Sequence, residues 1–149
     1  MQYWFYHLEK SSIEAAIVPL LEKCLQNDWA CLIRAQNANT LNELDKKIWS
    51  FKPDSWLPHA IEGEGVEASE QPILLTTSEE NSNFSQAFFI LENAPLGDID
   101  GVERIFYLID GNNENLVKAA RIEYKRAKDE GFELAYWQQN ENGKWEKKA

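Results

Sequence analysis

The sequence predicts an α/β fold in which a mostly parallel, doubly wound sheet carries helices on both faces. Strand-length apolar runs recur along the chain and are nearly continuous, as in strands buried on both faces. Amphipathic helices are expected between these runs, which is the pattern of a parallel sheet with crossover helices. The chain has 149 residues, 44% of them hydrophobic, so we expect a single domain over residues 1–149 with a sizeable core.

The first strand and the first helix are predicted at the start of the chain. Residues 2–8 are rich in aromatic side chains and are typical of a buried strand. Ser11 and Glu14 have the spacing of a capping box, so a helix is expected to start at this point. Pro19 falls inside the helix, and because proline lacks a backbone donor we expect a kink or a late helix start there.

A second strand and a second helix follow in the same order. Residues 29–35 predict the strand, and Thr40 with Glu43 predicts another capped helix start. The apolar positions of this helix recur at helical spacing, at Leu41, Leu44, Ile48 and Trp49. Two cysteines, Cys24 and Cys31, make neither a disulfide framework nor a metal set, so we expect both to be buried as small hydrophobic residues.

The second half of the chain begins with an irregular segment. Residues 50–70 predict a long loop because they are punctuated by Pro53, Pro58, Gly63 and Gly65. Three apolar runs then predict strands, at residues 72–77, 87–92 and 104–109. A last helix is expected from about Asn113 to Gly131, with a closing strand at residues 132–138.

Charge is distributed unevenly along the chain. The formal net charge is −10, from 25 acidic and 15 basic residues, which disfavours a broad nucleic-acid surface. Residues 54–114 hold thirteen acids and a single base, whereas residues 117–128 hold five bases and a single acid. Any anionic partner must therefore meet a local patch of positive charge.

The basic segment forms a stripe along the predicted last helix. At ~100° per residue, four bases fall within about 80° of one another, namely Lys118, Arg121, Lys125 and Lys128. An apolar stripe lies beside them at Leu116, Ala120, Tyr124 and Ala127, with Val117 and Tyr124 on the border. This border suits a short peptide with an acidic body and an apolar end. The alternative is a solvated helix face whose bases only confer solubility.

Signals for a cofactor or a metal ion are weak. The residues after the first strand contain no glycine, whereas a dinucleotide site needs a Gly-x-Gly-x-x-Gly turn there. The segment Gly63-Glu64-Gly65 is flanked by acids that would oppose a phosphate. His7 and His59 have no cysteine or carboxylate at ligand spacing, so we expect neither a metal ion nor a cofactor. His59 is expected to fix the turn at Pro58 by bonding to backbone.

Two other functions stay open at this stage. A hydrolase or transferase acting on a small molecule or a nucleotide could work at the strand ends near Thr76, Thr77 and Asp110, with His59 as the base. The second is direct binding of single-stranded DNA through the basic stripe and aromatic side chains, which the net charge disfavours.

The apolar runs also bear on the compartment. They are of strand length, far short of the ~20 residues that a membrane-spanning helix needs. The chain does not start with a basic segment followed by an apolar one, as a secretory signal would. We therefore expect a cytoplasmic protein without membrane contact.

Three segments, in order, resemble the chi subunit of bacterial DNA polymerase III holoenzyme. They are the aromatic first strand, residues 48–65 and residues 120–132, and the most specific part is Pro58-His59 followed by Gly63-Glu64-Gly65. The resemblance spans nearly the whole chain. It implies a Rossmann-like fold without nucleotide binding and a non-catalytic accessory protein. Such a protein joins the clamp loader to the acidic C-terminal tail of single-stranded DNA-binding protein.

The resemblance also implies which residues bind partners. The tail ends in Pro-Phe and is held by bases and an apolar pocket, which match Arg121, Tyr124, Lys125, Gly131 and Phe132 here. Val117 stands where relatives can carry a lysine, and Lys118 is expected to substitute for it. A second surface, for the psi subunit or a helicase-like partner, matches Trp49, Trp56 and Pro58. The alternative for both tryptophans is a place in the hydrophobic core.

Overall fold

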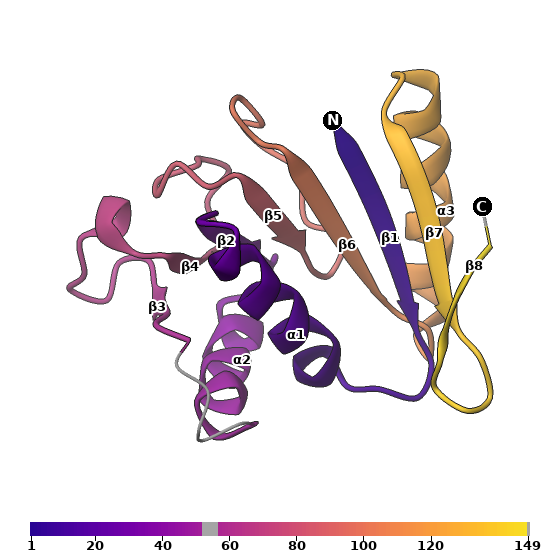
Figure 1. Cartoon of the computed structure of the whole chain (residues 1–149), viewed down its shortest axis with the longest axis horizontal. Helices are drawn as coiled ribbons and strands as arrows, with labels where there is room; N and C mark the ends of the chain where they lie inside the picture. Colours follow the sequence, from indigo (N-terminus) through magenta and orange to yellow (C-terminus); the bar gives the residue numbers. More distant parts are fainter. Residues whose placement is uncertain (52–56, 149) are drawn as a thin grey trace.

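One eight-stranded sheet organises the computed structural model, which describes residues 1–51 and 57–148 (Figure 1). The strand order is β3-β4-β2-β5-β6-β1-β7-β8, and every neighbouring pair is parallel except β7 and β8, which are antiparallel. The strands are β1 (Gln2–Leu8), β2 (Cys31–Arg34), β3 (Ala60–Ile61), β4 (Ile73–Thr76), β5 (Ala87–Ile90), β6 (Arg104–Asp110), β7 (Glu133–Gln139) and β8 (Trp145–Lys147). The predicted mostly parallel α/β sheet is confirmed.

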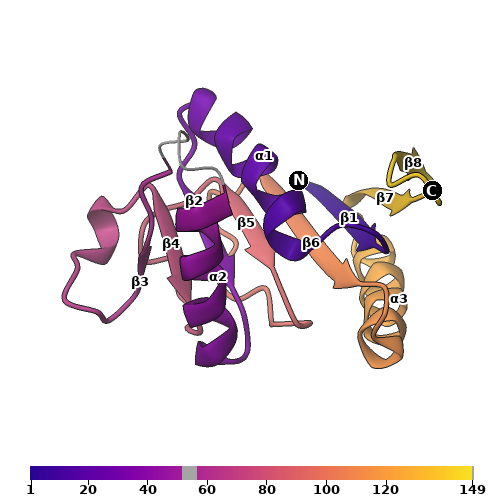
Figure 2. The same ribbon diagram turned by 90° about the horizontal axis from the view of Figure 1, so that it is seen from below.

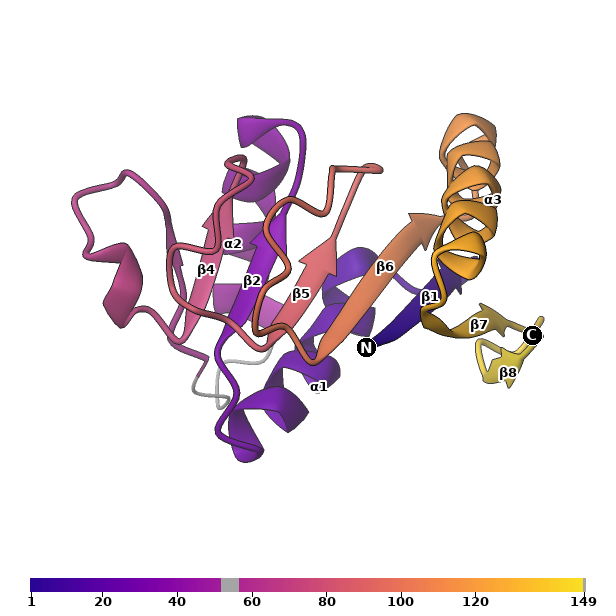
Figure 3. The ribbon, with the colours of Figure 1, turned by 90° about the horizontal axis from the view of Figure 1, so that it is seen from above.

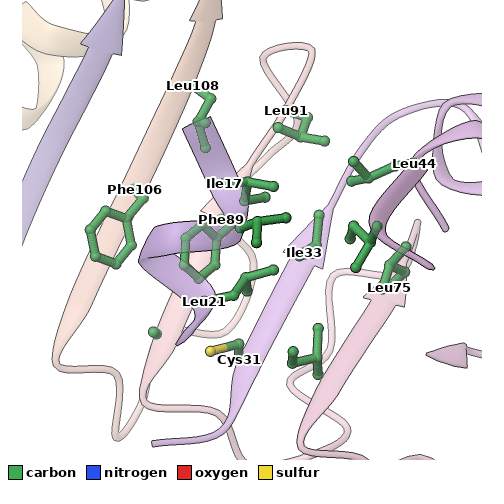
Figure 4. Close-up of a cluster of buried hydrophobic side chains, with 14 of the residues drawn as sticks. Ile17, Leu21, Cys31, Ile33, Leu44, Leu75, Phe89, Leu91, Phe106 and Leu108 are labelled. Atoms are coloured by element: carbon green, nitrogen blue, oxygen red, sulfur yellow. The ribbon is translucent and has the colours of Figure 1, made fainter. Parts of the chain in front are cut away.

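Three helices pack on this sheet: α1 (Ile13–Gln26), α2 (Ala38–Phe51) and α3 (Glu114–Asp129). The helices α1 and α2 cover one face and α3 covers the other, as views from below and above show (Figures 2 and 3). Under α1, Ile17 and Leu21 meet inward-pointing side chains of β2, β5 and β6 in an aliphatic and aromatic core (Figure 4). The predicted helices on both faces are therefore confirmed.

The second face is covered by α3 over only part of the sheet. Ala120 and Ala127 of α3 lie against a stack of aromatic side chains on β1 and β6. Over β2 and β5 this face is covered instead by the loop of residues 91–103, through Ala94 and Val102. Because a loop stands where a fully wound sheet carries a further helix, the Rossmann-like double winding stays a prediction.

The two predicted helix starts are both displaced. The N-cap of α1 is Ser12, whose hydroxyl accepts a hydrogen bond from the Ala15 amide, so the capping box predicted at Ser11 and Glu14 is wrong by one residue. The helix α2 begins at Ala38, which places Thr40 inside its first turn, where its hydroxyl donates to Glu92 at 2.8 Å. The capping box at Thr40 and Glu43 is therefore wrong, because Glu92 from a distant loop binds the helix start instead.

The remaining differences concern short elements and Pro19. The helix α1 continues through Pro19, so the late start expected there is wrong. The irregular segment of residues 50–70 contains β3 and a 3₁₀ turn at Ala68–Glu70, and β8 follows the predicted closing strand. Cys24 and Cys31 are buried and free, as predicted. Among the described residues, no helix is long and apolar enough to cross a membrane.

Candidate peptide-binding groove along the last helix

The orientation of α3 is fixed at both of its ends. At the start, the Asn113 side chain accepts hydrogen bonds from the amides of Asn115 and Leu116. At the end, Gly131 has a left-handed φ of 87°, and the Phe132 amide reaches back to the Ala127 carbonyl at 3.1 Å. This is the Schellman arrangement, and it confirms Gly131 as the residue after the helix end. The buried alanines of α3 leave its basic face directed away from the sheet.

Four bases of that face are unpaired within the described residues. They are exposed, and no carboxylate of the described residues lies within ion-pairing distance of them: Lys118, Arg121, Lys125 and Lys128. Arg126 differs, because it makes a bidentate pair with Glu123 at 2.6 and 2.7 Å and a second pair with Glu130 at 2.6 Å. The charge available to an anionic ligand therefore comes from the unpaired residues and not from Arg126.

Glu123 belongs to a structural network rather than to the basic face. Its carboxylate accepts hydrogen bonds from Arg126 and from the Tyr3 hydroxyl, which lies 2.6 Å away. Burial alone would raise the pKa of Glu123, but the hydrogen bonds from Arg126 and Tyr3 and the charge of Arg126 lower it overall. The only acid counted within the basic segment is thus turned inward and occupied.

Arg121 and Tyr124 line a hollow of about 310 Å³ between α3 and the end of the sheet. Its other lining residues are His7 from β1, Tyr136 and Gln138 from β7, and Lys148 just after β8. The Tyr124 ring meets the rings of Phe5 and Tyr136 edge to face, with centroids 5.3 and 5.9 Å apart. The hollow therefore combines cationic side chains with aromatic walls.

A second hollow, of about 490 Å³, continues from the first. The two share His7, Arg121 and Gln138, and the second adds Val117 and Lys118 together with the acids Glu9 and Glu114 and with Gly111. We call the two hollows together the α3 groove. Its positive charge is concentrated around Arg121, in the middle, while its acids lie at the end near the start of α3.

His7 forms part of the groove floor. Its Nδ1 lies 2.8 Å from the Tyr136 hydroxyl, and its Nε2 lies 3.5 Å from a Glu9 carboxylate oxygen. Burial lowers the pKa of His7 and the nearby Arg121 lowers it further, while Glu9 acts in the opposite direction. The neutral form is thus favoured, and Arg121 remains the cation at this point of the groove.

The structure brings together some of the residues implied for tail binding and separates others. Val117, Lys118, Arg121 and Tyr124 line the α3 groove, whereas Lys125 and Gly131 are exposed on and after the helix. Phe132 packs edge to face on Tyr3, with centroids 5.4 Å apart, and lines a separate hollow with Glu123 and Arg126. A role for Phe132 in tail binding stays a prediction.

The sequence did not predict a place in the groove for Tyr136, Gln138 and Lys148, which lie outside α3. Tyr136 and Gln138 alternate along β7, and the sheet register places His7 beside Gln138, so these side chains share the face that α3 covers. The alternation was visible in the sequence. The parallel pairing of β1 with β7 was not, and Lys148 follows a strand that the sequence did not predict.

The second implied surface lies near the end of α2. Trp49 is 51% exposed and its ring lies against that of His59, with centroids 4.2 Å apart, so the core interpretation of Trp49 is wrong. His59 is buried, with Nδ1 2.6 Å from the Leu57 carbonyl and Nε2 3.2 Å from an Asp45 carboxylate oxygen. The structural role predicted for His59 is confirmed. Pro58 is half-buried, and Trp56 lies outside the described residues.

The residues of the enzyme alternative are not brought together. A hollow of about 310 Å³ does lie at the strand ends, and Asp110 lines it with Glu14, Glu43 and Glu92. His59, Thr76 and Thr77 are not among its lining residues. Across residues 1–51 and 57–148, no group of three or more His, Cys, Asp or Glu side chains could hold a metal ion.

The turn after β1 is occupied by the protein itself. The side-chain oxygen of Gln139, which is buried, accepts hydrogen bonds from the amides of Glu9, Lys10 and Ser11 at 3.0, 3.0 and 3.1 Å. In dinucleotide-binding folds the backbone at this turn receives the pyrophosphate. Here these donors are already used, which argues against a nucleotide site at this position.

Comparison with known proteins decides the family. The family model described as DNA polymerase III chi subunit, HolC, matches residues 1–135. The chain belongs to the DNA polymerase III chi subunit family. The resemblance noted in the sequence is thereby confirmed, and membership makes the chain an accessory subunit of DNA polymerase III, consistent with the predicted non-catalytic role.

Two curated relatives agree with this assignment. The "Probable DNA polymerase III subunit chi" of Rickettsia prowazekii is 24% identical over 154 residues, covering 99% of this chain and 92% of the relative. The "DNA polymerase III subunit chi" of Pseudomonas aeruginosa is 24% identical over 115 residues, covering 77% of this chain and 78% of the relative. The match to the chi family model ends at residue 135, so most of β7 and all of β8 lie beyond it.

Proposed function

We propose that this chi-family chain binds the acidic C-terminal tail of single-stranded DNA-binding protein in the α3 groove and links it to the clamp loader. The observation that carries the proposal is the position of Arg121. It is a cation without an ion pair among the described residues, and it lies in a hollow that Tyr124 and Tyr136 help to line. A short anionic peptide with an apolar end matches that combination of charge and aromatic surface.

The two parts of the tail call for different parts of the groove. Arg121 offers a planar guanidinium that can hold a carboxylate through two hydrogen bonds. Lys118, in the adjoining hollow, lies on the same side of α3 and supports the acidic body of the peptide. The terminal phenylalanine is placed against Tyr124, where aromatic rings pack favourably edge to face. Val117 adds apolar surface next to Lys118.

The link to the clamp loader is assigned to the other end of the molecule. Trp49 is exposed and Pro58 lies beside His59, and an exposed tryptophan is a frequent centre of binding energy in protein interfaces. We propose Trp49 and Pro58 for contact with a psi-like subunit or a helicase-like partner, and for Trp56, which lies outside the described residues, the same role is proposed from the resemblance alone. Because replication in bacteria takes place in the cytoplasm, the chain is placed there.

Calorimetric titration with a synthetic acidic peptide ending in Pro-Phe tests the tail site. Arg121→Glu is expected to weaken binding about 30-fold or more, equivalent to about 2 kcal/mol, because it replaces a cation facing a partly desolvated carboxylate with a repelling charge. Lys23→Glu changes the net charge equally on the exposed end of α1 and serves as the control. Equal affinities for the wild type and Arg121→Glu would remove this site.

A gel shift with the protein alone separates tail binding from direct DNA binding. No shift of single-stranded DNA is expected at low salt, because the net charge of −10 repels a polyanion. A shift that Arg121→Glu abolishes would instead favour a nucleic-acid site on α3.

A further inference from the structure

The β7–β8 hairpin holds Lys148 against the α3 groove. In the antiparallel pairing, Gln138 lies opposite Glu146 and Trp137 lies opposite Lys147. The Lys148 amide then donates to the Tyr136 carbonyl at 2.7 Å, which extends the pairing by one residue. Because side chains alternate along a strand, Lys148 shares the face of Tyr136, whereas Lys147 points to the face of Trp137.

Lys148 and Arg121 approach the same hollow from two different elements. Arg121 comes from the helix and Lys148 from the end of the hairpin, and both line the hollow of about 310 Å³ together with Tyr124 and Tyr136. Two cations that line one hollow with aromatic side chains suit a ligand with more than one carboxylate. A single base on α3 would leave the opposite wall without charge.

Glu146 is the partner that Lys148 has in the free protein. The Lys148 ammonium lies 3.2 Å from one Glu146 oxygen, while the other oxygen accepts a hydrogen bond from Asn140 at 2.9 Å. Both side chains are about half exposed, so the pair is weak and readily exchanged. A carboxylate of a bound peptide can therefore take the place of Glu146 on Lys148.

We propose that the hairpin forms the second wall of the tail-binding site and that Lys148 is a further anion-binding residue of that site. This inference rests on the proposed function. Lys148 lies beyond residue 135, where the match to the chi family model ends. Glu146 acts as an internal competitor that a carboxylate of the peptide must displace.

Titration of the acidic peptide ending in Pro-Phe into matched variants tests this inference. Lys148→Gln is expected to weaken binding about three- to tenfold, since it removes one charge-assisted contact. Lys147→Gln changes the net charge equally on the opposite face of the hairpin and is expected to change affinity less than twofold. Thermal unfolding of both variants checks that these exposed substitutions leave the fold intact.

A substitution of Glu146 is expected to change peptide affinity in the opposite direction. Glu146→Gln is expected to strengthen binding about twofold, because it releases Lys148 from its internal partner, whereas Glu141→Gln, in the exposed hairpin turn, should not. If the wild type binds the peptide and Lys148→Gln binds as tightly as Lys147→Gln, the hairpin inference is overturned and the α3 site stands. If the wild type does not bind the peptide at all, the result contradicts the proposed tail-binding function itself and not only the role of the hairpin.

Discussion

Arg34 is fully buried at the carboxyl end of β2, where a charged side chain is costly. Its guanidinium donates to the carbonyls of Ser78 at 2.5 Å and Glu80 at 3.0 Å, and to that of Leu96, and it lies over the Phe88 ring at 5.0 Å. Several carbonyls from two loops thus replace the water that Arg34 loses. The sequence placed Arg34 in a strand but gave no sign of this role, because all of its partners are distant along the chain.

His7 is the titratable group of the α3 groove whose effect on stability has a clear sign. Its pKa is lowered from 6.5 in the folded protein, so below that pH the unfolded chain binds more protons than the folded one. Stability contributed by neutral His7 is complete above pH 6.5 and declines as the pH falls below it. The charged groups facing it are Glu9 and Arg121, and Tyr136 holds its Nδ1.

We therefore expect the midpoint temperature of unfolding to drop between about pH 7.5 and about pH 5.5, and to drop less in His7→Gln. Glutamine retains a polar group for Tyr136 but does not ionise. Thermal scans by circular dichroism in matched buffers measure how the midpoint temperature changes with pH in the wild type and in His7→Gln. This pH interval lies above the range in which Glu123 is protonated, because the pKa of Glu123 is lowered. A slope in His7→Gln as steep as in the wild type contradicts this account.

Gly131 follows the end of α3, the helix that carries Lys118 and Arg121 of the groove. Its φ of 87° is one that residues with a side chain rarely adopt, and a Cβ added there would meet no heavy atom within 4 Å. Gly131→Ala therefore introduces backbone strain and no clash, at a cost of about 1 kcal/mol in the free energy of unfolding. Gly131→Asn should recover part of this cost, because asparagine tolerates the left-handed region.

Urea unfolding of the two Gly131 variants measures the cost, and peptide titration measures what it does to the groove. If Gly131 acts only as the helix end, tail affinity should remain within about twofold of the wild type once the protein is folded. An alanine variant as stable as the wild type would show that the Schellman arrangement does not hold the end of α3.

The elements that the sequence predicted correctly are those with a strong local pattern. The apolar runs of β4, β5 and β6 and the periodicity of α3 are visible in a few consecutive residues. By contrast, β3 has two residues and β8 has three, too few for any periodicity to show. The start of α2 was misplaced because its capping carboxylate, Glu92, is separated by 52 residues from Thr40.

The candidate site also has one part that a local sequence pattern predicts and another part that it does not. The bases of α3 were predictable because helical spacing alone places Lys118 and Arg121 on one side. That Arg126 is occupied by Glu123 and Glu130 depends on rotamers and on the buried Tyr3 hydroxyl, which no spacing rule supplies. The opposite wall depends on which strands become neighbours, and that is a property of the whole sheet.

At the scale of the whole molecule, the sheet order separates the two signs of charge. The acid-rich residues 54–114 supply β3, β4, β5 and β6, while the basic helix α3 lies with β1 and β7 toward the other edge (Figure 3). With strands ~4.8 Å apart, β3 and β4 lie about 24 Å and about 19 Å from β1, whose His7 lines the groove. Charge screening has a length of about 10 Å at 0.1 M salt, so the acids around β3 and β4 act weakly on a peptide in the groove.

This separation predicts the sign of the salt dependence of tail binding. Affinity for the acidic peptide should fall steadily as salt rises from about 50 mM to about 500 mM, because the short-range attraction to Arg121 and its neighbours is what salt screens. If the net charge of −10 governed binding instead, salt would screen a repulsion and affinity would rise. Titrations at four salt concentrations distinguish the two signs, and Arg121→Glu, which removes the attraction, should show a flatter or inverted dependence.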